Sequence, residues 1–269
     1  IPIMPAVLLV DAVRGVLEHL GIERGVDIVY SGDLPGGTGL GSSSAFTVGL
    51  LHALHALVGN PPAARTPEAL SLEAIHVERE VLRETVGAQD QIMAAYGGAR
   101  FIEFPPGGAR PIVHGFHPRT HRVLGRLGRY LLLYYTGVTR VAGEIAREQV
   151  ARTPMLTSEL TAIKSLAYRG RKALVAGNID EIGLLLRESW KIKRGLTPLV
   201  TTPEIDAAIE TARAAGAVGW KLLGAGGGGF LLLFAAPGRH EAIRRALGPE
   251  RFAVPVRFAY EGSRVVLRT

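Results

Sequence analysis

The most informative stretch of the chain is Pro35-Gly36-Gly37-Thr38-Gly39-Leu40-Gly41-Ser42-Ser43-Ser44-Ala45, which joins a predicted strand at residues 26–30 to a predicted helix at residues 42–58. Glycine has no Cβ, so the backbone N–H groups of such a loop can approach an anion closely. The free N–H groups and the dipole at the start of the helix attract the same charge. The stretch therefore predicts a phosphate-binding loop; the alternative is a plain glycine turn before a serine-rich helix start.

Two common phosphate-binding motifs are excluded by the residues present. A Walker A loop needs Gly-Lys-[Ser/Thr], and the first lysine of this chain is Lys164. No Gly-x-Gly-x-x-Gly register fits residues 35–45, so the dinucleotide fingerprint is absent as well. The serine hydroxyls can instead donate to phosphate oxygens or serve as neutral ligands of Mg²⁺.

The composition is that of a globular chain with one large or two ordinary domains. Of its 269 residues, 47% are hydrophobic and 20% charged, which allows a sizeable core. No apolar run reaches the length of a membrane helix, and Asp11, Arg14 and Glu18 exclude a signal-peptide core at the start. The absence of cysteine excludes disulfides, Cys-ligated metals and thiol nucleophiles. These features together indicate a cytoplasmic protein.

Hydrophobic spacing and helix-start signals predict a mixed, α+β order of elements without regular β-α-β alternation. Thr66-Pro67 and Thr202-Pro203 are typical N-caps followed by proline in the first helical position. The predicted helices are residues 3–20, 42–58, 66–84, a short helix before 96, 144–152, 158–175, 179–193, 203–215 and 239–247. The predicted strands are residues 26–30, 100–104, 129–135, 220–223, 229–235 and two short ones at the end. A composition shift near residues 115–128 suggests two domains, 1–118 and 119–269.

A second glycine run, Gly224-Ala225-Gly226-Gly227-Gly228-Gly229, lies between two predicted apolar strands. A hairpin needs only one or two glycines, and four in succession weaken any strand. We therefore expect the backbone of this run to approach a ligand or the first glycine loop closely, and a flexible hairpin connection is the alternative.

The two loops together resemble motifs two and three of the GHMP kinases, a family that includes galactokinase, homoserine kinase and mevalonate kinase. The matching patterns are Pro-x-x-x-Gly-Leu-Gly-Ser-Ser, beginning at Pro35, and Lys-x-x-Gly-Ala-Gly-Gly-Gly-Gly, beginning at Lys221. Supporting segments follow in the family's order, at residues 78–80, 87–91, 135–137 and 188–190. The most similar branch is that of the D-glycero-D-manno-heptose 7-phosphate kinases, and the resemblance covers nearly the whole chain.

The resemblance implies a two-domain fold and a set of site residues. The N-terminal domain would be ribosomal protein S5 domain 2-like, without its first strands, and the C-terminal domain ferredoxin-like. Asp90 would be the catalytic carboxylate, turned toward the first loop with the help of Gly87, and Ser43 and Glu78 would hold Mg²⁺. The nucleotide would contact Pro35, Gly36, Gly37, Thr38, Gly39, Leu40, Gly41, Ser42, Ser43, Ser44, Gly226 and Gly227.

The implied activity is the transfer of the ATP γ-phosphoryl group, with Mg²⁺, to a sugar hydroxyl, in the first place that of D-glycero-D-manno-heptose 7-phosphate to give the 1,7-bisphosphate. A fucose- or galactose-type acceptor is the alternative. A phosphorylated sugar needs cations at its distal phosphate, for which Arg140, Lys193 and Arg194 are weak candidates. His52 and His55 lie three residues apart without a third metal ligand, so we interpret the histidines as structural.

The family's first motif, which precedes the first helix and contributes to the sugar site, has no counterpart in this sequence. We therefore expect a fragment, a chain completed by a second polypeptide or a second copy of itself, or a non-catalytic nucleotide-binding protein. A third class of function, RNA binding, rests only on the net charge of +7. The basic residues are scattered rather than grouped with aromatic side chains, so a nucleic-acid partner is not favoured.

Overall fold

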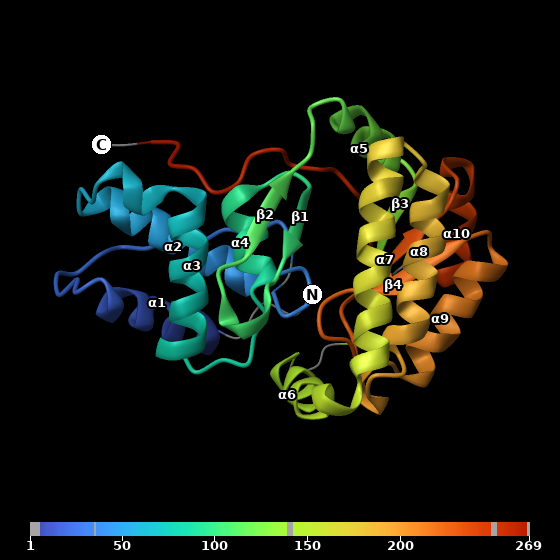
Figure 1. The fold of residues 1–269 in the computed structure, drawn as a ribbon, viewed down its shortest axis with the longest axis horizontal. Coiled ribbons are helices and arrows are strands. Elements are labelled where there is room, and N and C mark those ends of the chain that lie inside the picture. The colour runs from blue at the N-terminus through green and yellow to red at the C-terminus, as the bar shows by residue number, and fades with distance from the viewer. Residues whose placement is uncertain (1–5, 35, 139–141, 249–251, 268–269) are drawn as a thin grey trace. The chain divides into compact units, whose positions relative to one another are not determined.

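The computed structural model describes residues 6–34, 36–138, 142–248 and 252–267, and two compact units divide the chain. Unit 1 comprises Ile1–Ile102 and Ala259–Thr269, and unit 2 comprises Glu103–Phe258. The division lies inside strand β1 (Arg100–Glu103), and the last residues of the chain return to unit 1. The boundary that we predicted at residue 118 concerns the two family domains and stays a prediction. The α+β class is confirmed (Figure 1).

Unit 1 is built from helices that bury one apolar face each. Its core contains Val16, Leu51, Leu54, Leu70 and Val77, all of them nearly inaccessible to solvent. The elements that contribute this core are α1 (Ala6–His19), α2 (Ser42–Leu57), α3 (Pro67–His76), the π-helical turn η2 (Val77–Val81) and α4 (Gln89–Tyr96), and the short η1 (Pro62–Arg65) connects α2 to α3 without a buried residue. The cap predicted at Thr66 is confirmed, because its hydroxyl accepts from the N–H of Ala69 at 3.2 Å.

The strand that we predicted at residues 26–30 is wrong, since this segment has no regular structure. Val29 is 96% exposed, and Ile28 and Tyr30 are exposed as well. An extended segment becomes a strand only when a neighbour accepts and donates its ladder hydrogen bonds. No described residue pairs with this segment, so its β-branched composition is not sufficient to make it a strand.

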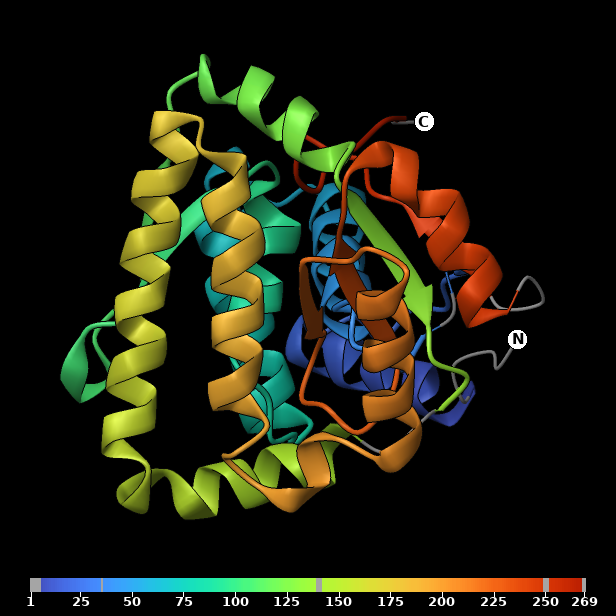
Figure 2. The same ribbon diagram turned by 90° about the vertical axis from the view of Figure 1, so that its right-hand side faces the viewer.

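Unit 2 is an antiparallel sheet of order β4-β5-β3-β6, covered by helices (Figure 2). The strands are β3 (Leu131–Tyr135), β4 (Gly219–Leu222), β5 (Phe230–Phe234) and β6 (Ala253–Pro255). Successive residues of a strand face opposite sides, so Leu132, Trp220 and Leu233 share the face that forms the main core. Ile205, Ile209 and Ile243 contribute to the same core from the helices.

The helices of unit 2 follow the sequence pattern closely. The N-cap at Thr202 is confirmed by its acceptance from the N–H of Ile205 at 3.4 Å, and the helix predicted at residues 179–193 has those bounds. The helices are α6 (Ala142–Arg152), α7 (Thr157–Ala176), α8 (Ile179–Lys193), α9 (Pro203–Ala214) and α10 (His240–Leu247), with the short turns η3 (Pro106–Gly108), η4 (Thr153–Met155), η5 (Pro198–Val200) and η6 (Pro237–Arg239).

Two elements of unit 2 were not predicted. Strand β2 (Ile112–Gly115) pairs with β1, and α5 (Thr120–Gly128) occupies the stretch that we interpreted as a domain boundary. Polar and glycine residues dominate α5, but Leu124 and Leu127 are buried at helical spacing. After β6, the described residues form no further strand, so the second of the two short terminal strands is not found. Among the described helices, none combines the length and the hydropathy needed to cross a bilayer.

Candidate active site

The first glycine loop of unit 1 leads directly into helix α2. Gly37, Gly39 and Gly41 have φ angles of 71°, 80° and 73°, so left-handed residues alternate with ordinary ones along the loop. Such an alternation turns successive backbone N–H groups toward one side. Gly41 is the N-cap of α2, and its carbonyl oxygen accepts the helix hydrogen bond from Ala45 N at 2.9 Å. The loop therefore has the backbone conformation of an anion-binding turn at a helix N-terminus.

The predicted loop residues take two kinds of position. Gly36, Gly37, Thr38, Gly39, Leu40 and Gly41 form the loop, and Ser42, Ser43 and Ser44 form the first turn of α2. Thr38 and Ser44 are buried, whereas Ser42 and Ser43 are partly accessible. Pro35 lies outside the described residues. Which of these residues contact a nucleotide stays a prediction.

Asp90 lies against the start of α2. It occupies the first turn of α4, and a Cβ placed on Gly41 would be 3.1 Å from its Cγ and 3.2 Å from its Oδ2. The Asp90 side chain is exposed on one side, but the chain around it reduces its hydration and raises its pKa, while a hydrogen bond with Gln89 acts in the opposite direction. Gly87 has no positive φ and its surroundings are open, so the turn that brings Asp90 here does not depend on a glycine at that position.

Glu78 is a buried carboxylate in the turn that follows α3. It lies in the π-helical turn η2, is 1% exposed, and its Oε2 accepts from Ser44 Oγ at 3.0 Å and from Gln91 Nε2 at 2.5 Å. Burial raises the pKa of Glu78, the hydrogen bonds from Gln91 and Ser44 oppose that rise, and the neighbouring Glu84 carboxylate adds to it. The hydrogen bonds tie η2 to the first turns of both α2 and α4.

The backbone at the end of η2 departs from a regular α-helix directly after Glu78. Leu82 N donates to Val77 O at 2.9 Å, which is the wider π-helical spacing, and Glu84 N donates back to Glu78 O at 2.9 Å. Arg83, between them, has a φ of 57°. A left-handed residue just after the last turn is a common way to end a helix, and π-turns are frequent at functional sites.

The chemistry of this site fits Mg²⁺. Glu78 Oε1 and Gln91 Oε1 are buried oxygens without a hydrogen-bond partner, and carboxylate, amide and hydroxyl oxygens are the ligands that a hard cation prefers. Glu78 contacts the hydroxyl of Ser44, which follows the predicted ligand Ser43 directly in the chain. No group of three or more acidic, His or Cys side chains among the described residues could hold a metal by itself. The metal role of Ser43 and Glu78 stays a prediction.

The second glycine run lies in unit 2, where its backbone is closely approached by other backbone of the same unit. A Cβ on Gly226 would be 2.9 Å from Val200 Cα, and one on Gly228 would be 2.5 Å from Val138 O. Gly227 N donates to Val200 O, and Gly229 N donates to Val138 O, both at 2.8 Å. The run is thus a firmly held β4–β5 connection that lies against residues 138 and 200, and the approach to a ligand or to the first glycine loop stays a prediction. Nucleotide contact by Gly226 and Gly227 stays a prediction.

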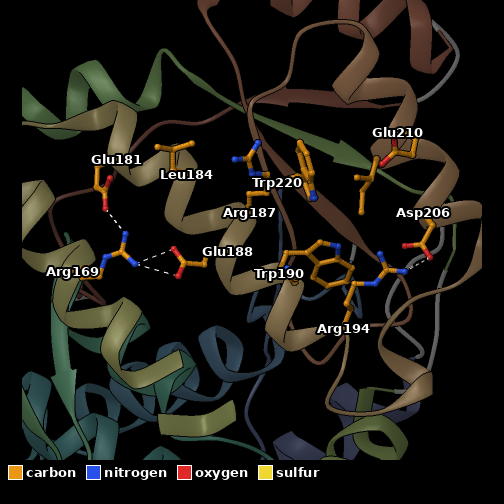
Figure 3. A pocket seen from close by; sticks show the side chains of 12 residues that line it. Arg169, Glu181, Leu184, Arg187, Glu188, Trp190, Arg194, Asp206, Glu210 and Trp220 are labelled. Carbon is orange, nitrogen blue, oxygen red and sulfur yellow. Dashed lines mark hydrogen bonds and ion pairs between the residues drawn. The ribbon is translucent and has the colours of Figure 1, made fainter. Parts of the chain in front are cut away.

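The three weak cation candidates have different surroundings. Lys193 Nζ donates to Leu222 O at 3.4 Å and to Gly224 O. Arg194 forms an ion pair with Asp206 at 2.8 Å, on the wall of a cavity of about 610 Å³ between α8 and α9 (Figure 3). Arg140 lies outside the described residues. Lys193 thus differs from Arg194 in lacking a carboxylate partner among the residues that the structure describes.

The histidine interpretation agrees with the contacts that are present. His55 Nε2 and Glu73 Oε2 lie 2.7 Å apart, and His52 Nδ1 and Ser263 Oγ lie 2.9 Å apart. Both histidines therefore have structural partners within unit 1.

Two residues, Gln91 and Lys221, were not predicted as site residues, and the hydrogen bond of the predicted residue Ser44 to Glu78 was not foreseen. The contacts of Gln91 and Ser44 with Glu78 join positions far apart in the chain, and neither contact gives a local signal. Lys221 belongs to the second motif, but its electrostatic effect on Lys193 depends on how α8 packs on β4. Residue spacing predicts which residues share one face of a helix, but it does not predict which other helix or strand packs against that face.

Comparisons with known proteins agree with the order of the two motifs. Residues 7–98 match the family described as GHMP kinases N terminal domain, and residues 171–254 match GHMP kinases C terminal. A D-glycero-alpha-D-manno-heptose 7-phosphate kinase of Campylobacter jejuni is 31% identical over 221 residues, covering 81% of this chain and 64% of that protein. A bifunctional fucokinase/GDP-fucose pyrophosphorylase of Arabidopsis thaliana is 28% identical over 237 residues, covering 87% of this chain and 22% of that protein.

A solved structure gives the same result for the fold. The crystal structure of a D-glycero-D-manno-heptose 1-phosphate kinase from Bacteroides thetaiotaomicron is similar with a TM-score of 0.73 and 26% identity, covering 94% of this chain and 72% of that one. The chain thus spans less than two thirds of the Campylobacter relative and about a fifth of the Arabidopsis one.

Proposed function

The chain belongs to the GHMP kinase family, and on this premise we propose that it transfers the γ-phosphoryl group of ATP to the anomeric hydroxyl of D-glycero-D-manno-heptose 7-phosphate. The single observation that supports this most is the position of Asp90 against Gly41, because it places a carboxylate beside the helix end that suits a phosphate. Phosphoryl transfer needs positioning and charge stabilisation more than covalent chemistry from the protein.

Each part of unit 1 has a task in this mechanism. The N–H groups of residues 36–44 bind the phosphate oxygens and orient the γ-phosphorus. Asp90 accepts or orients the proton of the acceptor hydroxyl, and its raised pKa makes it a better base than a fully hydrated aspartate. Ser44 and Gln91 hold the Glu78 carboxylate in one orientation by their hydrogen bonds.

Mg²⁺ is the expected cofactor, with Ser43 and Glu78 as its protein ligands. When bound, it neutralises the charge of the phosphate oxygens. The unpartnered Glu78 Oε1 is the observation that supports this assignment.

The experiment is a measurement of ADP release by the purified chain with ATP, Mg²⁺ and a sugar panel. The panel consists of D-glycero-D-manno-heptose 7-phosphate, the unphosphorylated heptose, L-fucose and D-galactose, and mass spectrometry identifies the product. Release that requires the heptose 7-phosphate and yields a bisphosphate would support the proposal. ATP binding by calorimetry without sugar-dependent ADP release would overturn it and favour a nucleotide-binding protein without turnover.

A fucose-type acceptor is the second candidate, and the similarity to the Arabidopsis fucokinase favours it. It predicts release with L-fucose and none with the heptose phosphate. The same panel separates the two, because a fucose site has no phosphate to hold.

A further inference from the structure

Two lysines of unit 2, Lys193 and Lys221, influence each other electrostatically. Lys193 ends α8, and Lys221 lies in the edge strand β4. Lys193 Nζ donates to the carbonyl oxygens of Leu222 and Gly224, the residues that follow Lys221 closely in the chain. Both side chains are half-buried, and within the described ranges no carboxylate pairs with either ammonium group.

Two arginines, one in α7 and one at the end of α8, have carboxylate partners, whereas the two lysines have none among the described residues. Arg169 pairs with Glu181 and Glu188, and Arg194 pairs with Asp206 (Figure 3). A cation withdrawn from water is costly unless an opposite charge compensates it. Burial lowers the pKa of Lys193 to about 7, with the Lys221 ammonium adding to the effect, and burial also lowers the pKa of Lys221.

The surroundings of the pair are rigid backbone. Residues 224–229 are fixed by hydrogen bonds from Gly227 and Gly229 to the carbonyls of residues 200 and 138, and Gln149 Nε2 donates to Ala225 O at 2.9 Å. Lys221 faces the opposite side of the sheet from Trp220, which is buried in the core. Lys193 Nζ is therefore held at a fixed turn by the carbonyl oxygens of Leu222 and Gly224, and the Lys221 ammonium group is near enough to repel it.

We propose that Lys193 and Lys221 together form a binding site for a phosphate group. A phosphate carries close to two negative charges and three acceptor oxygens, whereas each ammonium group offers three N–H donors. It would compensate both cations at once and remove their repulsion. The site rests on the geometry of unit 2 alone; its assignment to the distal phosphate of a sugar phosphate or to a phosphate of ATP rests on the proposed function.

The first experiment measures the thermal midpoint of the whole chain with increasing inorganic phosphate, for the wild type, Lys193→Met and Lys221→Met. Lys191→Met is the matched control, because Lys191 is an exposed lysine of the same helix. We expect phosphate to raise the midpoint of the wild type and of the control, and most of this rise to be lost in the other two variants. An equal response in all four proteins would overturn the proposal.

Folding of the variants is checked in the absence of phosphate. Methionine keeps the apolar stem of lysine and removes a charge that is poorly compensated, so both variants should be at least as stable as the wild type. If one variant does not fold, the other still provides the comparison with Lys191→Met.

A second experiment identifies the source of the phosphate through KM values. If the phosphate belongs to the sugar, the KM for the heptose 7-phosphate rises about 10- to 100-fold in Lys193→Met and Lys221→Met, as expected for one or two charge-assisted hydrogen bonds, and the KM for ATP does not change. If it belongs to the nucleotide, the KM for ATP rises instead. Unchanged values of both would overturn the assignment of this phosphate to either substrate.

The two proposals can fail separately. Lysine-dependent phosphate binding without any sugar-dependent ADP release would leave the site standing and overturn the kinase assignment. Turnover of the heptose phosphate, with the same KM values and the same phosphate response in the wild type and the lysine variants, would support the kinase assignment and overturn the phosphate site.

Discussion

Gly41 and Asp90, 49 positions apart in the chain, are in contact: a Cβ on Gly41 would be 3.1 Å from the Asp90 carboxyl carbon. This contact joins the N-terminus of α2, which suits a phosphate, to the carboxylate that we propose as the base. A glycine is required at position 41 for two reasons, its φ of 73° and the proximity of Asp90.

The Gly41→Ala variant tests this contact. The left-handed backbone costs an alanine roughly 1–2 kcal/mol, and the methyl group displaces the Asp90 carboxylate, so we expect kcat to fall at least about tenfold. Gly49→Ala is the control on the same helix, since its surroundings are open, and it should stabilise the protein by about 0.5–1 kcal/mol. Urea unfolding and steady-state kinetics measure both effects. A wild-type kcat in Gly41→Ala would contradict the assignment.

The Asp90→Asn variant tests the role of the carboxylate. An amide cannot take the proton of the sugar hydroxyl that receives the phosphoryl group. We therefore expect kcat to fall about 10²- to 10⁴-fold while the Kd of ATP changes little. Isothermal calorimetry and ADP release provide the two readouts. Asp27→Asn, which changes an exposed carboxylate of unit 1, should behave like the wild type. Full turnover by Asp90→Asn would exclude Asp90 as the base.

The Ser44→Ala variant tests the buried Glu78 network without any nucleotide. It removes one of the two donors to Glu78 Oε2, and we expect the free energy of unfolding to fall by about 1–3 kcal/mol. Ser31→Ala removes an exposed hydroxyl of the same unit and should change it by less than about 0.5 kcal/mol. Equal values for the two variants in urea unfolding would show that the Ser44–Glu78 bond contributes nothing.

The stability of Lys193→Met relative to the wild type should depend on pH. The folded pKa of Lys193 is about 7, below its ordinary value of 10.5, so the unfolded chain binds the additional proton. The resulting destabilisation of the wild type is complete below pH 7 and disappears as the pH rises from 7 through 10.5. Lys193→Met should therefore be the more stable protein at pH 6, and its advantage should shrink steadily up to pH 10. A difference between the two unfolding curves that does not vary with pH would contradict the burial of this cation.

The Gly228→Ala variant tests the close approach of the second glycine run to residue 138. Position 228 has no positive φ, so the cost comes from the contact of 2.5 Å with Val138 O, and we expect roughly 1–3 kcal/mol of lost stability. Gly238→Ala, which also has an ordinary φ but open surroundings, is the control. If thermal unfolding gives the same midpoint for both variants, the run is looser than the structure indicates.

The helices were predictable because their signals are local. Thr66 and Thr202 cap helices through hydrogen bonds that reach three residues ahead, and α8 begins and ends where its spacing indicates. Helix α5 escaped prediction because only Leu124 and Leu127 stand out in a polar stretch. The strand predicted at residues 26–30 is absent because a strand needs a paired neighbour, and local composition does not show whether a distant segment supplies one.

The candidate site was predictable in its residue types and only partly in its contacts. The loop, Asp90 and Glu78 were selected by motif order, but the bonds of Glu78 to Ser44 and Gln91 depend on a π-helical turn that has no pattern of its own. The hydrogen bond from Gly227 N to Val200 O could not be predicted from the sequence either, because the two residues are 27 positions apart.

Local patterns in the sequence were sufficient for the helices other than α5, the two glycine runs and the family, since these depend on hydrogen bonds and spacings within a few residues. The tertiary structure was needed to show that Asp90 lies against Gly41, that Glu78 is buried, and that neither Lys193 nor Lys221 has a carboxylate partner within the described part of the chain. The physical reason is that burial and charge compensation are properties of groups brought together from distant positions. Their free energies depend on neighbours in space rather than on neighbours in the chain.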